Sequence, residues 1–144
     1  MSRLSNFIKL PAEEKILSIE AFFFIVAVRL ALWLIPFRLF QKFAVENLSG
    51  RARQDETDWA KIKKIARLVG RVNGLLPFTT CLTQALAALL MIKLSGQESE
   101  LKIGVAKSGG VKFEAHAWLE KNGRILLGRV PEHERYVTLN FYPK

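Results

Sequence analysis

The chain has 144 residues, half of them hydrophobic, with one cysteine and two histidines. This length and composition suit a single compact domain that builds its own core. One cysteine rules out an intrachain disulfide and suits a reducing cytosol, so we expect a cytoplasmic protein. A zinc site is disfavoured because one cysteine and two separated histidines lack metal-ligand spacing. We therefore expect no metal and no other cofactor.

Basic residues outnumber acidic ones by 22 to 13, which gives a net charge of +9. Such a charge favours an acidic peptide, a nucleic acid or an anionic membrane surface, without choosing among them. The sequence contains no Gly-rich phosphate loop and no aromatic RNA-binding motif. A nucleic acid is therefore not expected as a partner.

An apolar run over residues 21–37 follows a charged N-terminal stretch. Arg29 stands at its centre and Pro36 near its end, and a charge at mid-bilayer costs about 3 kcal/mol, so a spanning helix is disfavoured. Charged residues before the run and the lack of a small-residue cleavage site argue against a signal peptide. We expect a buried helix over residues 12–35, with Pro11 at its first turn. A helix lying on a membrane surface is the alternative.

The chain is expected to divide into an N-terminal helical segment over residues 1–50, packed on a core over residues 55–144. Between them, residues 47–57 are polar and read as a linker. Thr57 or Asp58 is expected to cap the next helix, from Trp59 to about Val72, which has one apolar face and one basic face.

Cys81 stands where a turn gives way to the strongly helical run Leu82–Leu94. Thr79 or Thr80 is the expected N-cap, which places Cys81 in the first turn. An unperturbed thiol, with a pKa near ~8.5, is mostly protonated at neutral pH. The unpaired N–H groups and the helix dipole favour its thiolate, and the same N–H groups suit the oxyanion of a tetrahedral intermediate. The alternative is that Cys81 is a small core residue.

Beyond residue 96 the hydrophobic period changes from helical to two. Three strands are expected over residues 100–107, 112–121 and 124–130, with a two-residue hairpin turn at Asn122-Gly123. Helices followed by an antiparallel sheet predict an α+β fold, with the cysteine helix packed on the second strand.

His116 lies on that second strand, and a histidine there suits the general base for a cysteine nucleophile. Alternatively, His116 simply occupies the mixed face of a strand. The second histidine, His133, lies in a polar stretch and is expected to be solvated.

These motifs together resemble the transglutaminase-like maturation proteases of lasso-peptide biosynthesis. The resemblance rests on Cys81-Leu82 at the start of an Ala- and Leu-rich helix and on the strand over residues 101–105. It rests also on Ala115-His116-Ala117-Trp118-Leu119-Glu120 followed by Asn122-Gly123. Residues 10–15 and 34–38 resemble the helical segment that precedes that family's catalytic core. The resemblance covers most of the chain and implies a transglutaminase or papain-like fold.

The activity implied by the resemblance is that of a hydrolase that removes the leader from a ribosomally synthesised precursor peptide. Cys81 attacks the scissile carbonyl, and His116 takes the thiol proton and returns it to the leaving amine. The implied partners are the leader of the precursor, a separate small leader-recognition protein and an ATP-dependent lasso cyclase. The recognition protein is expected to be separate because the chain begins almost directly with the family's helical segment.

The sequence departs from the family at the third member of the triad. The family's aspartate falls at Gly128, which has no side chain to orient an imidazole. Glu114 or Glu132 takes that role, or the enzyme works as a dyad, or it has lost activity. The two-residue turn would pair His116 with Arg129, unless a bulge near Gly128 changes the register.

Two other classes of function stay open. One is a non-catalytic scaffold that holds an acidic leader peptide with its basic helix and sheet edge. The other is a peripheral membrane protein that uses residues 16–40.

Overall fold

The computed structural model of the chain describes residues 8–48, 57–108, 112–130 and 133–139. Within these ranges the helices precede the sheet, so the predicted α+β order is confirmed. The helices are α2 (Ala12–Leu34), α3 (Phe37–Leu48), α4 (Trp59–Leu75) and α5 (Cys81–Leu94). The strands are β1 (Glu100–Ser108), β2 (Lys112–Lys121), β3 (Arg124–Leu127) and β4 (Val137–Leu139), with a short 3-10 helix η2 (His133–Arg135) before β4.

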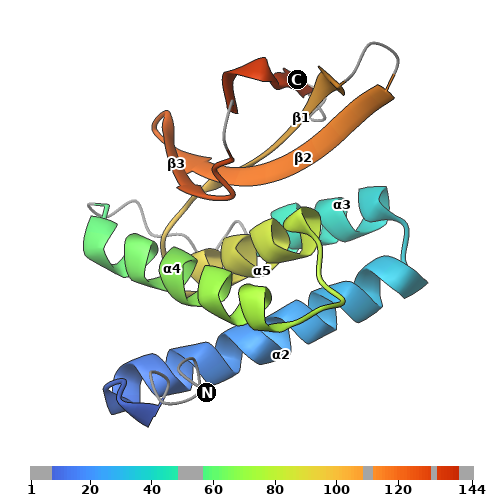
Figure 1. Cartoon of the computed structure of the whole chain (residues 1–144). Helices are drawn as coiled ribbons and strands as arrows, with labels where there is room; N and C mark the ends of the chain where they lie inside the picture. The colour runs from blue at the N-terminus through green and yellow to red at the C-terminus, as the bar shows by residue number, and fades with distance from the viewer. Residues whose placement is uncertain (1–7, 49–56, 109–111, 131–132, 140–144) are drawn as a thin grey trace.

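The elements form three layers, which Figure 1 shows from the side. The sheet forms one outer layer, α4 and α5 form the middle, and α2 lies on the far side from the sheet. Helix α2 packs on both α4 and α5, while α5 packs on β2. The predicted contact between the cysteine helix and the histidine strand is therefore confirmed.

The sheet is antiparallel, in the order β3-β2-β1-β4. Asn122 and Gly123 both have positive φ, 50° and 77°, as a two-residue hairpin turn requires, which confirms the predicted turn. The third strand is shorter than the expected 124–130 and ends at Leu127, because Gly128 has a φ of 94° that breaks the extended backbone. The sequence pattern did not predict β4.

The core fills the space between the three layers. Ala117 and Leu119 of β2 are buried together with side chains of α5, α4 and α2. The expectation of a buried helix over residues 12–35 is wrong in one respect. Helix α2 buries a single face, with Ser18, Ala21 and other small or branched side chains, and leaves much of its apolar surface exposed.

Side-chain caps fix where α4 and α5 begin. The Asp58 carboxylate accepts a hydrogen bond from the Lys61 N–H at 3.0 Å, which selects Asp58 over Thr57 as the cap. Helix α4 extends three residues beyond the predicted end near Val72. Helix α3 was not predicted. The linker predicted over residues 47–57 lies mostly outside the described residues.

Candidate active site

Cys81 is the first residue of α5, as the sequence predicts. Thr80 is the N-cap, and its hydroxyl oxygen accepts from the Thr83 N–H at 3.2 Å. The Gln84 N–H donates to the Thr80 carbonyl at 3.0 Å. Among the described residues the Cys81 and Leu82 N–H groups have no such acceptor. The half-buried thiol therefore sits beside two backbone donors at the positive end of α5.

His116 lies in the middle of β2, opposite Gly104 of β1, and is half-buried. Its Nε2 forms a hydrogen bond of 2.5 Å with the carbonyl oxygen of Gly128. A carbonyl oxygen only accepts, so Nε2 carries the proton and Nδ1 is the nitrogen that is free to take one. Within the described part of the chain, Nδ1 has no hydrogen-bond partner.

Gly128 brings its carbonyl to the imidazole by coming very close to β2. A Cβ atom on Gly128 would lie 2.9 Å from Trp118 Cβ and 3.0 Å from the Ala117 carbonyl oxygen. The φ of 94° is also one that residues with side chains rarely adopt. Position 128 therefore requires glycine, and this close approach is what lets a backbone group reach His116.

A shift of register explains why Arg129 does not face His116 across a regular pair. The pairing changes between Leu119 and Glu120, so that Leu119 lies opposite Leu127 and Glu120 opposite Ile125. The regular pairing of β2 with β3 ends at Leu119, before it reaches His116. The His116–Arg129 pair expected from a regular hairpin is therefore wrong, and the alternative of a bulge is confirmed.

The two acidic residues considered as orienting groups have different positions. The Glu114 carboxylate lies 3.8 Å from the Arg135 guanidinium and accepts from the Tyr136 hydroxyl at 3.4 Å. Its oxygens make no hydrogen bond with His116 in the described chain. Glu132 lies outside the described residues.

His133 belongs to an aromatic cluster around His116, which the sequence reasoning missed. Its ring centroid lies 4.5 Å from that of Trp118 and 6.1 Å from that of His116, and Tyr136 joins them 5.5 Å from His116. Both ring nitrogens of His133 are buried without a partner among the described residues. The expectation that His133 is solvated is therefore wrong, because η2 folds it against β1 and β2.

The thiol and the imidazole are carried by neighbouring elements. The β2 side chains that are buried with α5 are Ala117 and Leu119. The His116 ring instead stacks on Trp118, which alternates with them along the strand, so the imidazole lies on the face of the sheet that turns away from α5. No hydrogen bond joins the Cys81 thiol to the His116 ring among the described residues. The pairing of these two groups as nucleophile and base stays a prediction.

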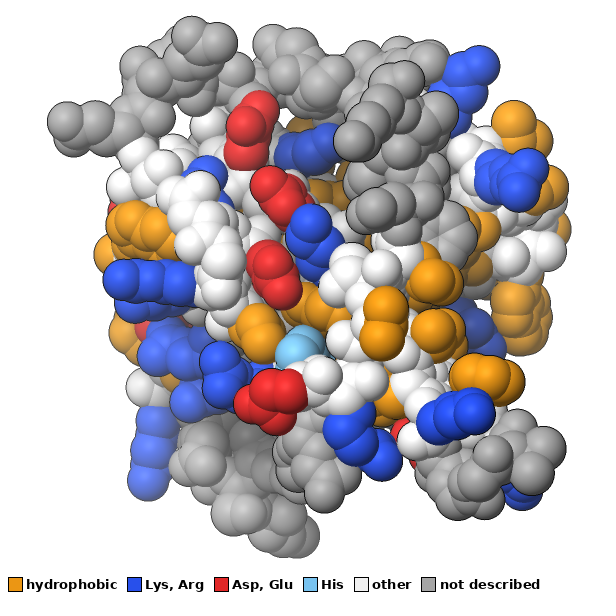
Figure 2. All heavy atoms as spheres, turned by 90° about the horizontal axis from the view of Figure 1, so that it is seen from above, with side chains coloured by type: hydrophobic (Ala, Val, Ile, Leu, Met, Phe, Trp, Pro, Cys, Tyr) orange, Lys and Arg blue, Asp and Glu red, His pale blue; other side chains and the backbone are white. Residues whose placement is uncertain are grey.

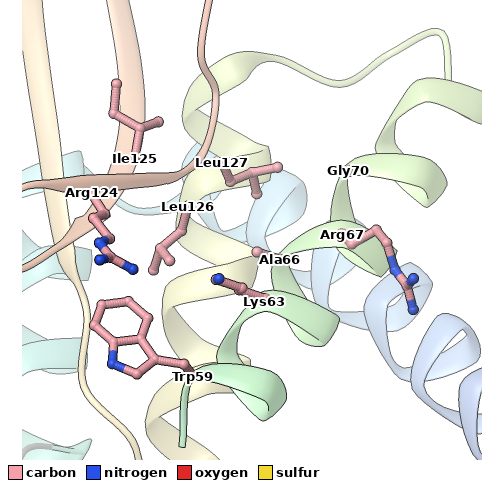
Figure 3. Close-up of a pocket in the computed structure, with 9 residues that line it drawn as sticks. All are labelled: Trp59, Lys63, Ala66, Arg67, Gly70, Arg124, Ile125, Leu126 and Leu127. Carbon is pink, nitrogen blue, oxygen red and sulfur yellow. The ribbon is translucent and has the colours of Figure 1, made fainter. Parts of the chain in front are cut away.

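A separate basic pocket of about 300 Å³ lies between α4 and β3. Figure 3 shows Lys63 extending from α4 toward Trp59 and Leu126, while Arg67 points away. The Arg124 guanidinium lies 5.3 Å from the centre of the Trp59 ring. Neither Lys63 nor Arg124 has an acidic partner within the described part of the chain. The pocket thus offers two unpaired cations above an apolar floor that includes Ala66 and Leu127.

Seen from the sheet side, the molecule carries its charges unevenly. Figure 2 shows Lys and Arg side chains gathered along the left flank of this face, with a row of acidic side chains through its middle. The basic excess is therefore not uniform over this surface.

A helix that begins at a cysteine and packs on a histidine-bearing strand is the arrangement of a cysteine-protease type of fold. Comparison with protein families matches residues 23–140 to the transglutaminase-like superfamily, and the protein belongs to that superfamily. The superfamily includes cysteine proteases. Searches of curated proteins and of solved structures give no match.

Proposed function

We propose that the protein is a cysteine peptidase that removes the leader from a ribosomally synthesised precursor peptide during lasso-peptide maturation. The observation that supports this most is the hydrogen bond between His116 Nε2 and the Gly128 carbonyl. In this bond the backbone carbonyl of Gly128 takes the part of the aspartate side chain that the resemblance implies at position 128. The bond fixes the tautomer in which Nδ1 is a base, which is the main positional task of a third triad member.

The reaction follows from these groups. His116 Nδ1 takes the proton of the Cys81 thiol, and the thiolate sulfur attacks the scissile carbonyl carbon. The imidazolium returns the proton to the leaving amine as the C–N bond breaks, which leaves a thioester on Cys81. Water then attacks the thioester, giving its proton to Nδ1, and the acid product leaves as the thiol is restored.

The first turn of α5 supplies the donors for the oxyanion. Thr80 already binds the N–H groups of Thr83 and Gln84, so the N–H groups of Cys81 and Leu82 are the pair that remains. A donor of this kind contributes about 3 kcal/mol to the transition state. The cap thus leaves the two N–H groups closest to the sulfur for the reaction.

The Gly128 carbonyl is a neutral acceptor, whereas the aspartate of the family is charged. It stabilises the imidazolium through a dipole rather than a full charge. The proposed enzyme therefore keeps the correct tautomer and gives up part of the electrostatic stabilisation.

The basic pocket supports a substrate with acidic residues. Arg124 belongs to β3, an edge strand of the sheet, and Lys63 lies on α4 across the pocket. An extended peptide pairs readily with such an edge. The partners in this scheme are the leader of the precursor, a small leader-recognition protein and an ATP-dependent cyclase, all in the cytoplasm.

Alkylation by iodoacetamide tests the catalytic pair without a known substrate. Cys81 is the only thiol, so the rate between pH 5 and 10 reports on it alone. We expect substantial alkylation at pH 6 and at least a tenfold lower rate there in His116→Ala. His133→Ala serves as the matched control, since it removes the neighbouring imidazole of the same cluster.

A second candidate function is a scaffold that binds the leader without cutting it. The unpaired cations of the basic pocket favour it, because they serve binding whether or not Cys81 reacts. A thiol that reacts only above pH ~8, like a free cysteine, and that ignores the loss of His116 would select the scaffold over the peptidase.

A further inference from the structure

The outer face of α2 is apolar and open to solvent. Phe23, Trp33 and Leu34 have exposed fractions of 65%, 73% and 82%. Folded monomers rarely leave so many large apolar side chains together on one surface, and such a patch marks a site of interaction. The exposed large apolar residues of α2 are Ile16, Ile19, Phe22, Phe23, Leu30, Trp33 and Leu34.

This face is continuous and wide. At 100° per residue, the exposed apolar positions of α2 lie within an arc of about 140° around the helix, with Phe22 at one edge and Ala27 at the other. Between Ile16 and Leu34, no charged residue lies inside this arc. Glu20 and Arg29 flank the arc on opposite sides. An arc of this width exceeds the narrow seam of a two-stranded coiled coil, which needs two positions in seven.

Helix α3 follows α2 after a two-residue connection, contacts it and carries exposed apolar and basic side chains near the C-terminal end of α2. Leu39 and Phe43, one helical turn apart, are exposed by 57% and 65%. Arg38 and Lys42 precede them by one position each and are also exposed. Apolar and basic side chains in adjacent rows are typical of helices that lie in a membrane interface.

The charges around the face are mainly positive. Near the start of α2, Glu13 lies 3.6 Å from the Lys64 ammonium and Glu14 lies 2.9 Å from the Arg67 guanidinium, so both carboxylates are neutralised. Glu20 is then the one acid that flanks the face without an ion pair among the described residues. This one negative charge compares with three positive charges, those of Arg29, Arg38 and Lys42.

From the apolar arc and its basic border we propose that the α2–α3 face docks on the surface of an anionic lipid bilayer. By length and composition α2 is able to cross a membrane. Its opposite face, however, packs into the protein core on α4 and α5 through Ile25 and Val28. The helix therefore lies in the plane of the interface, with Trp33 inserted and the Arg29 guanidinium stacked 5.6 Å from its ring centre.

Docking in this way leaves the candidate active site free. The sheet lies on the other side of the molecule from the outer face of α2, and α5 lies in the layer between them (Figure 1). A peptide thus has access to Cys81 and the basic pocket while the protein is bound to lipid. The docking does not depend on the peptidase activity, because none of its residues belongs to the candidate active site.

Flotation with lipid vesicles through a density gradient tests the docking, since bound protein rises and aggregated protein sinks. The probe is phosphatidylcholine vesicles with and without one quarter phosphatidylglycerol, at 100 mM salt. We expect flotation with the anionic vesicles, with partition lowered about fivefold by each of Arg38→Gln and Lys42→Gln. The double variant Phe23→Glu/Leu30→Glu is expected to lower partition at least about 100-fold.

Phe113→Glu is the matched control, because Phe113 is 69% exposed on β2 and far from α2 in the layers of the fold. It is expected to float like the wild type, and thermal melts of all variants check that they fold. Failure of the wild type to float, or equal loss in the control, would overturn the proposal. A dimer that the double variant converts to a monomer, without flotation of the wild type, would assign the face to a second copy instead.

Discussion

Replacement of Gly128 by alanine tests how the imidazole of His116 is held. The new Cβ would lie 2.9 Å from Trp118 Cβ, 3.0 Å from the Ala117 carbonyl oxygen and 3.1 Å from Trp118 Cα. These neighbours are backbone atoms and the rigid start of a buried side chain, so they have little room to move. The chain at residue 128 must shift, and its carbonyl must move away from His116 Nε2.

The cost of Gly128→Ala has two parts. A left-handed backbone costs a residue with a side chain about 1–2 kcal/mol. Overlap with a packed neighbour adds about 1–3 kcal/mol. We therefore expect Gly128→Ala to lower the free energy of unfolding by about 2–5 kcal/mol.

Gly96→Ala is the control that separates the two parts. Gly96 has a φ of 90°, close to the 94° of Gly128, but a Cβ there would meet nothing within 4 Å. It is expected to lose only the backbone part, about 1–2 kcal/mol. The difference between the two variants measures the overlap at residue 128.

Urea unfolding measures both free energies, and alkylation of Cys81 at pH 6 measures the effect on the site. We expect Gly128→Ala to slow alkylation toward the rate of His116→Ala, and Gly96→Ala to leave it unchanged. Equal stability of the two glycine variants, together with wild-type alkylation in Gly128→Ala, would refute the role given to the Gly128 carbonyl.

Three further changes have definite outcomes. Thr80→Ala removes the hydroxyl that caps α5 and should cost about 1 kcal/mol by urea unfolding. Burial lowers the pKa of the Lys93 ammonium from 10.5, so its charge destabilises the fold below the lowered value. Lys93→Met should therefore raise the urea midpoint at pH 7, and this gain should shrink as the pH rises toward 10.5. Lys63→Gln with Arg124→Gln should weaken binding of a fluorescent glutamate-rich peptide at least tenfold by anisotropy, while Arg71→Gln should not.

Local signals in the sequence were enough to place the helix that begins at Cys81 and the hairpin at Asn122-Gly123. A threonine before an Ala- and Leu-rich run predicts the start of a helix, and an Asn-Gly pair between alternating strands predicts a two-residue hairpin turn. The position of His116 on the strand beside that helix also follows from the order of elements. These features depend on neighbours within a few residues, which the sequence displays directly.

Features that depend on distant contacts were not predictable in the same way. The sequence placed His133 in a polar stretch, yet its ring is buried because Trp118 and Tyr136 come together around it. The apolar run of α2 predicted burial, but the core has room for one face of that helix only. A glycine inside an expected strand indicates a bulge or a close approach of the backbone, so the irregular backbone at Gly128 was predictable from the sequence.

The glycine at residue 128 turns an apparent defect of the triad into a consistent arrangement. There is no space for a side chain at this position, because the backbone contacts Trp118. The same close approach brings the Gly128 carbonyl within hydrogen-bond distance of His116 Nε2. An acceptor without a charge selects the tautomer of His116 and brings no countercharge to the ring. In the proposed mechanism, the N–H groups of Cys81 and Leu82 in the first turn of α5 are the donors next to the sulfur. Under the proposed function, the cap at Thr80 acts on the Cys81 side of the proton transfer and the Gly128 carbonyl acts on the His116 side.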